Sequence, residues 1–274
     1  MTNSKSSNLS DWILYRSQRG KYTFSFQEIV INFSHLSKQT LKNNLNLLVK
    51  KGDIIPVFKG FYSIIPIEYS LFSIVPPDFY INDLMKSLCR PYYVGLLNAA
   101  AFYGAAHQKP QTFSVITSLP TLRDTTKKNT RIAFISTRKI IPQKWIKTIR
   151  GKNGDFFISK PELTAVDLIT FQKEIGGLNR ACTVLYELME VVKFGKLDRT
   201  FFDYVPTSTI QRLGYLLENE LTQEEQADIF FSKAKTHGCK FQKIPLKYNK
   251  PTADSKINEK WKIIINELIE IDEL

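Results

Sequence analysis

Apolar residues recur every three or four positions in the first 66 residues and predict three short helices there. The first is expected over residues 9–18, with Ser10 as its N-cap. The second is expected over residues 27–33, after a cap at Ser25. A turn then leads into a third helix from residue 38 to about residue 51, and the glycine that follows is a typical C-cap.

The third helix has two unlike faces. Leu41, Leu45 and Leu48 recur at the spacing of a buried stripe. The other face is polar, and the helix contains no acidic residue. A helix that only faces solvent usually mixes both signs of charge, whereas amides and ammonium groups together can contact base edges and phosphates. The polar residues of this face are Lys38, Gln39, Lys42, Asn43, Asn46 and Lys50.

Residues 53–65 alternate and turn, which predicts a hairpin with its turn near residues 58–60. Three helices followed by such a hairpin are typical of a winged helix-turn-helix domain, in which the third helix enters the major groove and the hairpin touches the backbone. The alternative is a small helical domain with a basic surface that faces only solvent.

Proline residues at 66, 76 and 77 indicate a domain boundary. We therefore expect an α+β protein with a winged helix-turn-helix domain over residues 1–66, a linker over 67–82, and a larger mixed α/β domain with a C-terminal extension over 83–274. In the larger domain, helices are expected over 83–89, over 93–106, from Pro161 and within 179–221, and strands over 112–117, 131–136, near 146, over 156–158 and over 261–265, with a loop over 121–130.

Charge is distributed unevenly along the 274 residues. The chain carries a formal charge of +12, and 43% of its residues are hydrophobic, as in ordinary globular proteins. Residues 1–66 have a net charge of +6, residues 67–160 of +9, and residues 161–274 of −3. Because the basic surplus belongs to the first 160 residues, it indicates one face that meets a polyanion, with nucleic acid as the leading class.

Several classes of protein lack their usual signals here. The three cysteines are far apart, form no zinc-binding spacing, and are expected to be buried thiols in a reducing cytoplasm. No secretory signal and no membrane-spanning run is visible. We therefore expect a cytoplasmic protein that needs no metal and no cofactor.

Catalytic groups are also missing at the spacings that enzymes use. Hydrolase, metalloprotease and P-loop motifs do not occur. Asp155 lacks the carboxylate and lysine neighbours of a nuclease site and is expected to cap a turn, while Asp167 is expected to be structural or ion-paired. The three histidines, His35, His107 and His237, are expected to pack or to face solvent. The sequence therefore predicts no enzyme, although a nucleic-acid-processing enzyme remains an alternative.

The candidate DNA contacts lie on the third helix and in the hairpin turn. Ser37 and Thr40 join the polar face at the N-terminal turn, where free backbone N–H groups suit a phosphate. Lys59 and Gly60 occupy the turn. Since one such domain reads only a few base pairs, specific binding calls for two copies on an inverted repeat.

A second basic set lies in the middle of the chain. It can extend a DNA footprint, face another anionic partner such as RNA or an acidic protein surface, or only face solvent. Its members are Arg123, Lys127, Lys128, Arg131, Arg138, Lys139, Lys144, Lys147, Arg150 and Lys152.

Four segments of the chain resemble signatures of the AbiEi antitoxins. Residues 92–111 read YYVGLLNAAAFYGAAHQKPQ, residues 161–168 read PELTAVDL, residues 211–218 read QRLGYLLE, and residues 258–266 read NEKWKIIIN. They follow the N-terminal domain in the order that the family has, which is more specific than any one segment.

The resemblance implies a type IV antitoxin of an abortive-infection system. Such proteins repress their own operon by binding inverted repeats in its promoter, as monomers or dimers that pair on double-stranded DNA. Their C-terminal domain counters a nucleotidyltransferase-like toxin, without a need for a stable complex. The alternative on the residues alone is a winged-helix regulator whose second domain binds an effector.

Overall fold

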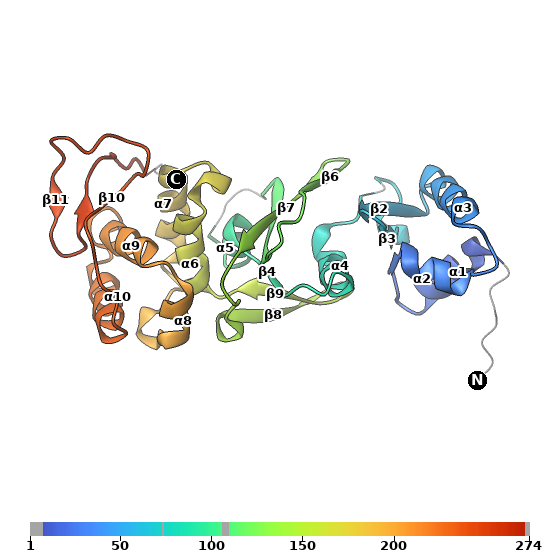
Figure 1. Cartoon of the computed structure of the whole chain (residues 1–274), viewed down its shortest axis with the longest axis horizontal. Coiled ribbons are helices and arrows are strands. Elements are labelled where there is room, and N and C mark those ends of the chain that lie inside the picture. Colours follow the sequence, from blue (N-terminus) through green and yellow to red (C-terminus); the bar gives the residue numbers. More distant parts are fainter. Residues whose placement is uncertain (1–7, 73, 106–109, 272–274) are drawn as a thin grey trace.

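The computed structural model describes residues 8–72, 74–105 and 110–271. Three parts follow one another along the long axis in Figure 1: an N-terminal unit (residues 8–64), a central sheet, and a helical part that ends at the C-terminus. The predicted mixed α+β fold is confirmed.

The N-terminal unit contains three helices and a three-stranded antiparallel sheet in the order β1-β3-β2. The first and third helices begin and end where the pattern predicts. The N-cap at Ser10 is wrong, because Asn8 accepts the backbone N–H of Asp11 at 2.9 Å. The elements are α1 (Leu9–Gln18), β1 (Thr23–Ser25), α2 (Phe26–Asn32), α3 (Lys38–Lys51), β2 (Ile54–Phe58) and β3 (Phe61–Ile64).

Local capping and one small core hold these elements. Ser25 and Glu28 form a reciprocal capping box at α2. Gly52 ends α3 with a φ of +80°, which only glycine adopts without strain. The buried leucines of α3 pack with Trp12, Phe24 and other apolar side chains. The hydrophobic stripe predicted for α3 is therefore confirmed.

The central sheet has six strands in the order β6-β7-β5-β4-β9-β8. Its strands alternate between two buried faces. Tyr92 and Val94 of β4 point to the face toward the N-terminal unit, whereas Tyr93 points to the helical part. The strands are β4 (Tyr92–Val94), β5 (Thr112–Ser118), β6 (Thr125–Lys127), β7 (Thr130–Thr137), β8 (Ile146–Gly151) and β9 (Gly154–Ser159).

The segment predicted as a linker packs between the N-terminal unit and the central sheet. It contains the short 3₁₀ helices η1 (Ile67–Tyr69) and η2 (Pro77–Phe79) and leads into α4 (Ile81–Ser87). Val75 and Phe79 are buried in the same cluster as Val57 and Phe61 of the N-terminal sheet and Phe134 of β7. One continuous core therefore joins the N-terminal unit to the central sheet.

The helical part covers the other face of the sheet. Trp261 is fully buried against α9, whose Gln211 donates to the Trp261 backbone oxygen at 2.7 Å. Two of the family-like segments, residues 211–218 and 258–266, therefore pack together. The elements are α5 (Leu96–Phe102), η3 (Gln143–Trp145), α6 (Pro161–Thr170), η4 (Gln172–Ile175), α7 (Leu178–Leu188), η5 (Phe194–Lys196), α8 (Arg199–Tyr204), α9 (Thr207–Asn219), α10 (Glu224–Thr236), β10 (Ile244–Pro245), β11 (Ile257–Asn258) and β12 (Ile263–Ile264).

The structure corrects several sequence expectations in these parts. The helix predicted over 93–106 is wrong at its start, because residues 92–94 form β4 and α5 begins at Leu96, which has a φ of +55°. The predicted loop over 121–130 contains β6, and the predicted strand over 261–265 is reduced to two residues. Helix α10 was not predicted. Cys89 is exposed, so burial of every cysteine is also wrong.

Among residues 8–72, 74–105 and 110–271, no helix combines the length and the apolar character that crossing a membrane requires.

Candidate nucleic-acid interface

Helix α3 turns its polar face to solvent. Leu41 and Leu45 have exposed fractions of 0% and 1%, while all eight polar candidates on and before this helix are exposed: Ser37, Lys38, Gln39, Thr40, Lys42, Asn43, Asn46 and Lys50. In Figure 1 the helix lies in the N-terminal unit, at the opposite end of the molecule from the helical part. The sequence missed one member of this face, Leu47, which is 56% exposed.

Hydrogen bonds order the first turns of α3. Ser37 accepts the backbone N–H of Thr40 at 3.0 Å, and the two hydroxyls lie 2.9 Å apart. Gln39 Nε2 donates to Asn43 Oδ1 at 3.0 Å. The two amides therefore form a short ladder along the exposed face, and the remaining carbonyl of Gln39 and amide N–H groups of Asn43 stay available for a base edge.

The hairpin turn is held from two sides. The backbone N–H of Phe26 donates to the Gly60 oxygen at 2.8 Å, and the ring of Phe58 lies 5.7 Å from that of Phe134. Lys59 is exposed between them. Because β3 pairs with β1 from its first residue, Phe61, the hairpin is short, and Lys59 lies close to the body of the protein.

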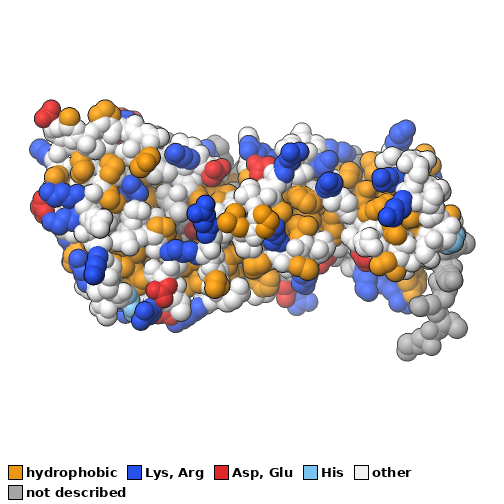
Figure 2. All heavy atoms as spheres, viewed as in Figure 1, with side chains coloured by type: hydrophobic (Ala, Val, Ile, Leu, Met, Phe, Trp, Pro, Cys, Tyr) orange, Lys and Arg blue, Asp and Glu red, His pale blue; other side chains and the backbone are white. Residues whose placement is uncertain are grey.

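Part of the second basic set lies beside this hairpin. Edge strand β6 packs near β2, where Thr125 Oγ1 donates to the Val57 oxygen at 3.4 Å. We call Arg123, Lys127, Lys128 and Arg131 the β6-edge group; all four are exposed, and Arg131 pairs with Asp124 at 3.1 Å. Figure 2 shows Lys and Arg side chains over the N-terminal unit and over the neighbouring part of the sheet.

The rest of the second basic set lies elsewhere. Lys147 and Arg150 are on β8, at the opposite edge of the sheet from β6. Lys144 forms an ion pair with Asp198. The Lys139 side chain donates to the backbone carbonyl oxygen of Asp203 at 2.8 Å, and Arg138 is exposed after β7. Lys152 donates to the hydroxyl of Tyr69 at 3.1 Å. The ten residues therefore do not form one continuous surface.

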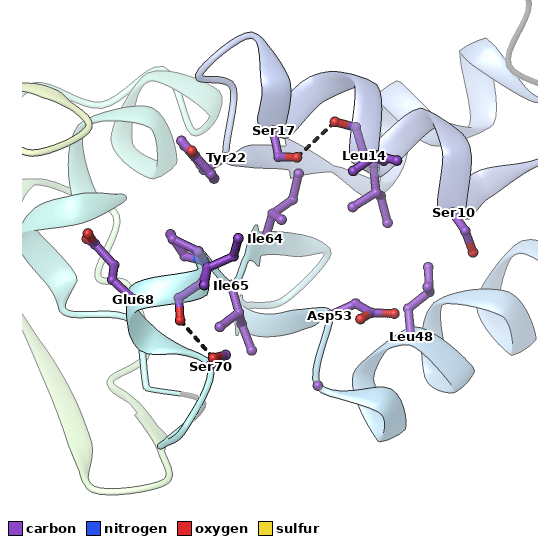
Figure 3. A pocket seen from close by; sticks show the side chains of 14 residues that line it. Ser10, Leu14, Ser17, Tyr22, Leu48, Asp53, Ile64, Ile65, Glu68 and Ser70 are labelled. Atoms are coloured by element: carbon purple, nitrogen blue, oxygen red, sulfur yellow. Dashed lines mark hydrogen bonds between the residues drawn. The ribbon is translucent and has the colours of Figure 1, made fainter.

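A cavity of about 620 Å³ lies behind α3, between α1 and residues 64–70 (Figure 3). Its described lining includes the carboxylates of Asp53 and Glu68 but no lysine or arginine. Ser17 in this wall donates to the Leu14 oxygen at 2.8 Å. The charged side chains of this cavity are therefore acidic, whereas those on the exposed face of α3 are basic.

Asp167 is buried in the core rather than ion-paired. Its Oδ2 accepts the hydroxyl of Tyr93 at 2.9 Å, and that hydroxyl lies 3.1 Å from the hydroxyl of Tyr204. Burial raises the pKa of Asp167 to about 8, although the Tyr93 hydrogen bond lowers it. The carboxyl is thus protonated at neutral pH and holds α6 to β4, so the structural alternative is confirmed and the ion pair is wrong.

The other titratable candidates are scattered. Asp155 lies in β9 opposite Arg150, so the predicted turn cap is wrong. His35 is exposed beside Phe33, and His237 stacks on Phe202 at 5.1 Å. His107 lies outside the described residues. Within the described chain, no three His, Cys, Asp or Glu side chains gather in a way that could hold a metal ion.

Residues 93–219 match the family model described as the AbiEi antitoxin C-terminal domain. The matched segment begins in β4 and ends with α9, so α3 and the hairpin lie before it. No curated protein matches the sequence.

A solved structure of low sequence identity shares the fold of this chain. The crystal structure of the RV2827C protein from Mycobacterium tuberculosis aligns with a TM-score of 0.64 and 12% identity, over 93% of this chain and 90% of that chain. A nucleotidyltransferase-like antigenic protein from Paracoccidioides brasiliensis aligns with a TM-score of 0.34 and 8% identity, over 56% and 90% of the two chains. The first likeness extends through the N-terminal unit, which the family match does not include.

Proposed function

Since this chain belongs to the AbiEi antitoxin family, we propose that it is a type IV antitoxin that also represses its own operon. In this proposal the N-terminal unit binds inverted repeats in the promoter, and the larger C-terminal part counters a nucleotidyltransferase-like toxin. The chain acts without catalysis, and a stable complex with the toxin is not required.

The main support for DNA binding is the exposed face of α3, which has amide and lysine side chains but no acidic residue. The order of three helices and a hairpin supports a winged helix-turn-helix, with α3 as the recognition helix. In the major groove, Gln39 and Asn43 would contact base edges, while Lys38, Lys42 and Lys50 would neutralise phosphates.

The hairpin and the β6-edge group support a wider footprint. Lys59 would contact the DNA backbone beside α3. Because β6 packs against β2, Lys127 and Lys128 lie next to the N-terminal unit and would meet phosphates farther along the same duplex. Two copies, paired on an inverted repeat, would supply enough base contacts for specificity.

A binding series on the full chain tests this assignment. Fluorescence anisotropy with a labelled promoter fragment is measured for Lys42→Ala and Lys59→Ala at several salt concentrations. Each change should weaken binding to all sequences and reduce the salt slope by about one ion. Lys240→Ala is the matched control, since Lys240 is exposed in the C-terminal part.

Amide variants test sequence reading separately from charge. Gln39→Ala and Asn43→Ala should each cost about 1–3 kcal/mol of discrimination at one base pair, while binding to non-specific DNA stays near that of the wild type. If all four variants bind the promoter as tightly as the wild type does, α3 is not the DNA-binding surface.

A further inference from the structure

Five lysines from separate segments surround one cavity of about 500 Å³ in the C-terminal part: Lys144, Lys147, Lys160, Lys193 and Lys196. Only the first two belong to the basic set seen in the sequence. Lys160 precedes α6, whereas Lys193 precedes η5 and Lys196 is the last residue of η5, more than thirty positions farther along the chain. The fold therefore gathers ammonium groups that the sequence keeps apart.

Buried contacts fix the segments that carry these lysines. Glu162 is 8% exposed, and its Oε1 accepts the backbone N–H of Lys193 at 3.2 Å, which ties the η5 segment to the start of α6. Lys144 is paired with Asp198. Burial alone would raise the pKa of Asp198, but hydrogen bonds from Lys144, Thr200 and the Phe201 backbone lower it to about 2.

The described lining of the cavity has a surplus of positive charge. Five lysines face a single acidic residue there, Glu162, while Asp198 pairs with Lys144 from outside the lining. A second cavity shares Lys193 and Lys196 and is lined by three further acidic residues, Glu190, Glu224 and Glu225. No side chain of the described residues caps the start of α6, where the positive end of the helix dipole adds to the same field. Such a cavity favours a ligand with several negative charges.

The rest of the wall is uncharged. Tyr103, Trp145, Pro161 and Val191 complete the lining. Tyr103 is fixed by donating its hydroxyl to the Ser159 oxygen at 2.9 Å, and Val191 is 40% exposed. The volume is in the range of small-molecule sites and exceeds what phosphate groups alone would fill.

We propose that this lysine cavity is a binding site for a nucleoside triphosphate, with the phosphates held by Lys160, Lys193 and Lys196 and the nucleoside against the uncharged wall. The site is separate from α3, because it lies in the C-terminal part of the fold. It requires no chemical step, only binding.

Isothermal titration of the full chain with ATP tests the proposal. The wild type should bind ATP saturably, tripolyphosphate should compete, and adenosine should bind much more weakly. The triple variant Lys160→Ala/Lys193→Ala/Lys196→Ala should lose at least about tenfold in affinity, as expected when charge-assisted hydrogen bonds are removed. The matched control is Lys173→Ala/Lys240→Ala/Lys256→Ala, which removes equal charge from exposed positions outside the cavity and should bind ATP like the wild type.

Three results would overturn the proposal. The first is an absence of saturable ATP binding by the folded wild-type chain. The second is equal ATP binding by the two triple variants. The third is a triple cavity variant that loses affinity for promoter DNA while ATP does not compete with that DNA, because the lysines would then belong to a DNA footprint.

Discussion

Gly214 shows at the scale of one residue how the C-terminal segment closes on α9. A Cβ atom at this position would lie 2.1 Å from Cη2 and Cζ3 of Trp261. The indole cannot move away, because its Nε1 donates to Glu218 Oε2 at 2.5 Å and the ring is fully buried. A glycine inside a helix is here a requirement of packing.

We therefore expect Gly214→Ala to lower the free energy of unfolding by about 1–3 kcal/mol or more. The physical reason is overpacking against a fixed ring. Gly195→Ala is the matched control, since an added Cβ there meets no atom of the described residues within 4 Å and should change stability by less than about 0.5 kcal/mol. Chemical denaturation measures the free energy of unfolding of both variants. Equal values for the two would contradict the close packing of Trp261 on Gly214.

A second single residue, Asp167, makes the stability of the protein depend on pH. Its pKa rises from 3.8 to about 8 on folding, so between these values the unfolded chain loses the proton while the folded chain keeps it. The contribution of this carboxyl to stability is therefore full below about pH 4 and is lost progressively up to about pH 8.

Asp167→Asn removes this titration and can still accept the Tyr93 hydroxyl. Relative to the wild type, the free energy of unfolding of the variant should therefore rise as the pH increases from about 4 to about 8. Urea unfolding across this range measures the difference, with Asp155→Asn as an exposed control. Parallel curves for wild type and Asp167→Asn would show that the buried carboxyl does not titrate as proposed.

At the scale of elements, helix α3 has one buried face and one exposed face, and each face contains a leucine that can be tested. Leu45 is 1% exposed and Leu47 is 56% exposed. Leu45→Ala should cost about 2–5 kcal/mol through a cavity in the small core, whereas Leu47→Ala should stay within about 0.5 kcal/mol. Thermal unfolding of the full chain compares them. A Leu47→Ala variant as unstable as Leu45→Ala would mean that α3 is rotated about its axis.

Elements with strong local signals were predictable from the sequence. Helices α1 and α3 have periodic apolar residues and end signals such as Gly52. Strand β4 was misread because its turn into α5 uses Leu96 at a positive φ, which no local rule indicates. Strand β6 was missed because an exposed edge strand of threonine and lysine looks like a loop. Helix α10 was not predicted, although its sequence has two glutamates at the start and Gly238 after the end, which are typical helix start and stop signals.

The two candidate sites also differ in whether the sequence alone could predict them. The polar face of α3 is local, so periodicity alone placed its residues on one side. The lysine cavity depends on tertiary contacts such as the Glu162 side chain with the Lys193 backbone, and no spacing in the sequence could indicate it.

At the scale of the whole molecule, the N-terminal unit and the central sheet share a core. Thr23 Oγ1 donates to Asp83 Oδ2 at 2.6 Å, and Val57 and Phe61 are buried in the shared cluster. The orientation of α3 relative to the β6-edge group is therefore set by packing, which would let both meet one duplex. A fragment of residues 1–66 would expose this apolar face, so tests of DNA binding need the full chain.

The most direct test of the central claim, that DNA binding resides on α3 and antitoxin activity elsewhere, is one cell-based measurement with two readouts. Cells carry the native promoter fused to a reporter together with an inducible copy of the toxin, and express either the wild-type chain or the full-length Lys42→Ala/Asn43→Ala variant. We expect the double variant to lose repression of the reporter and to keep its rescue of growth, with a thermal stability equal to that of the wild type. Retained repression by the double variant would contradict the account.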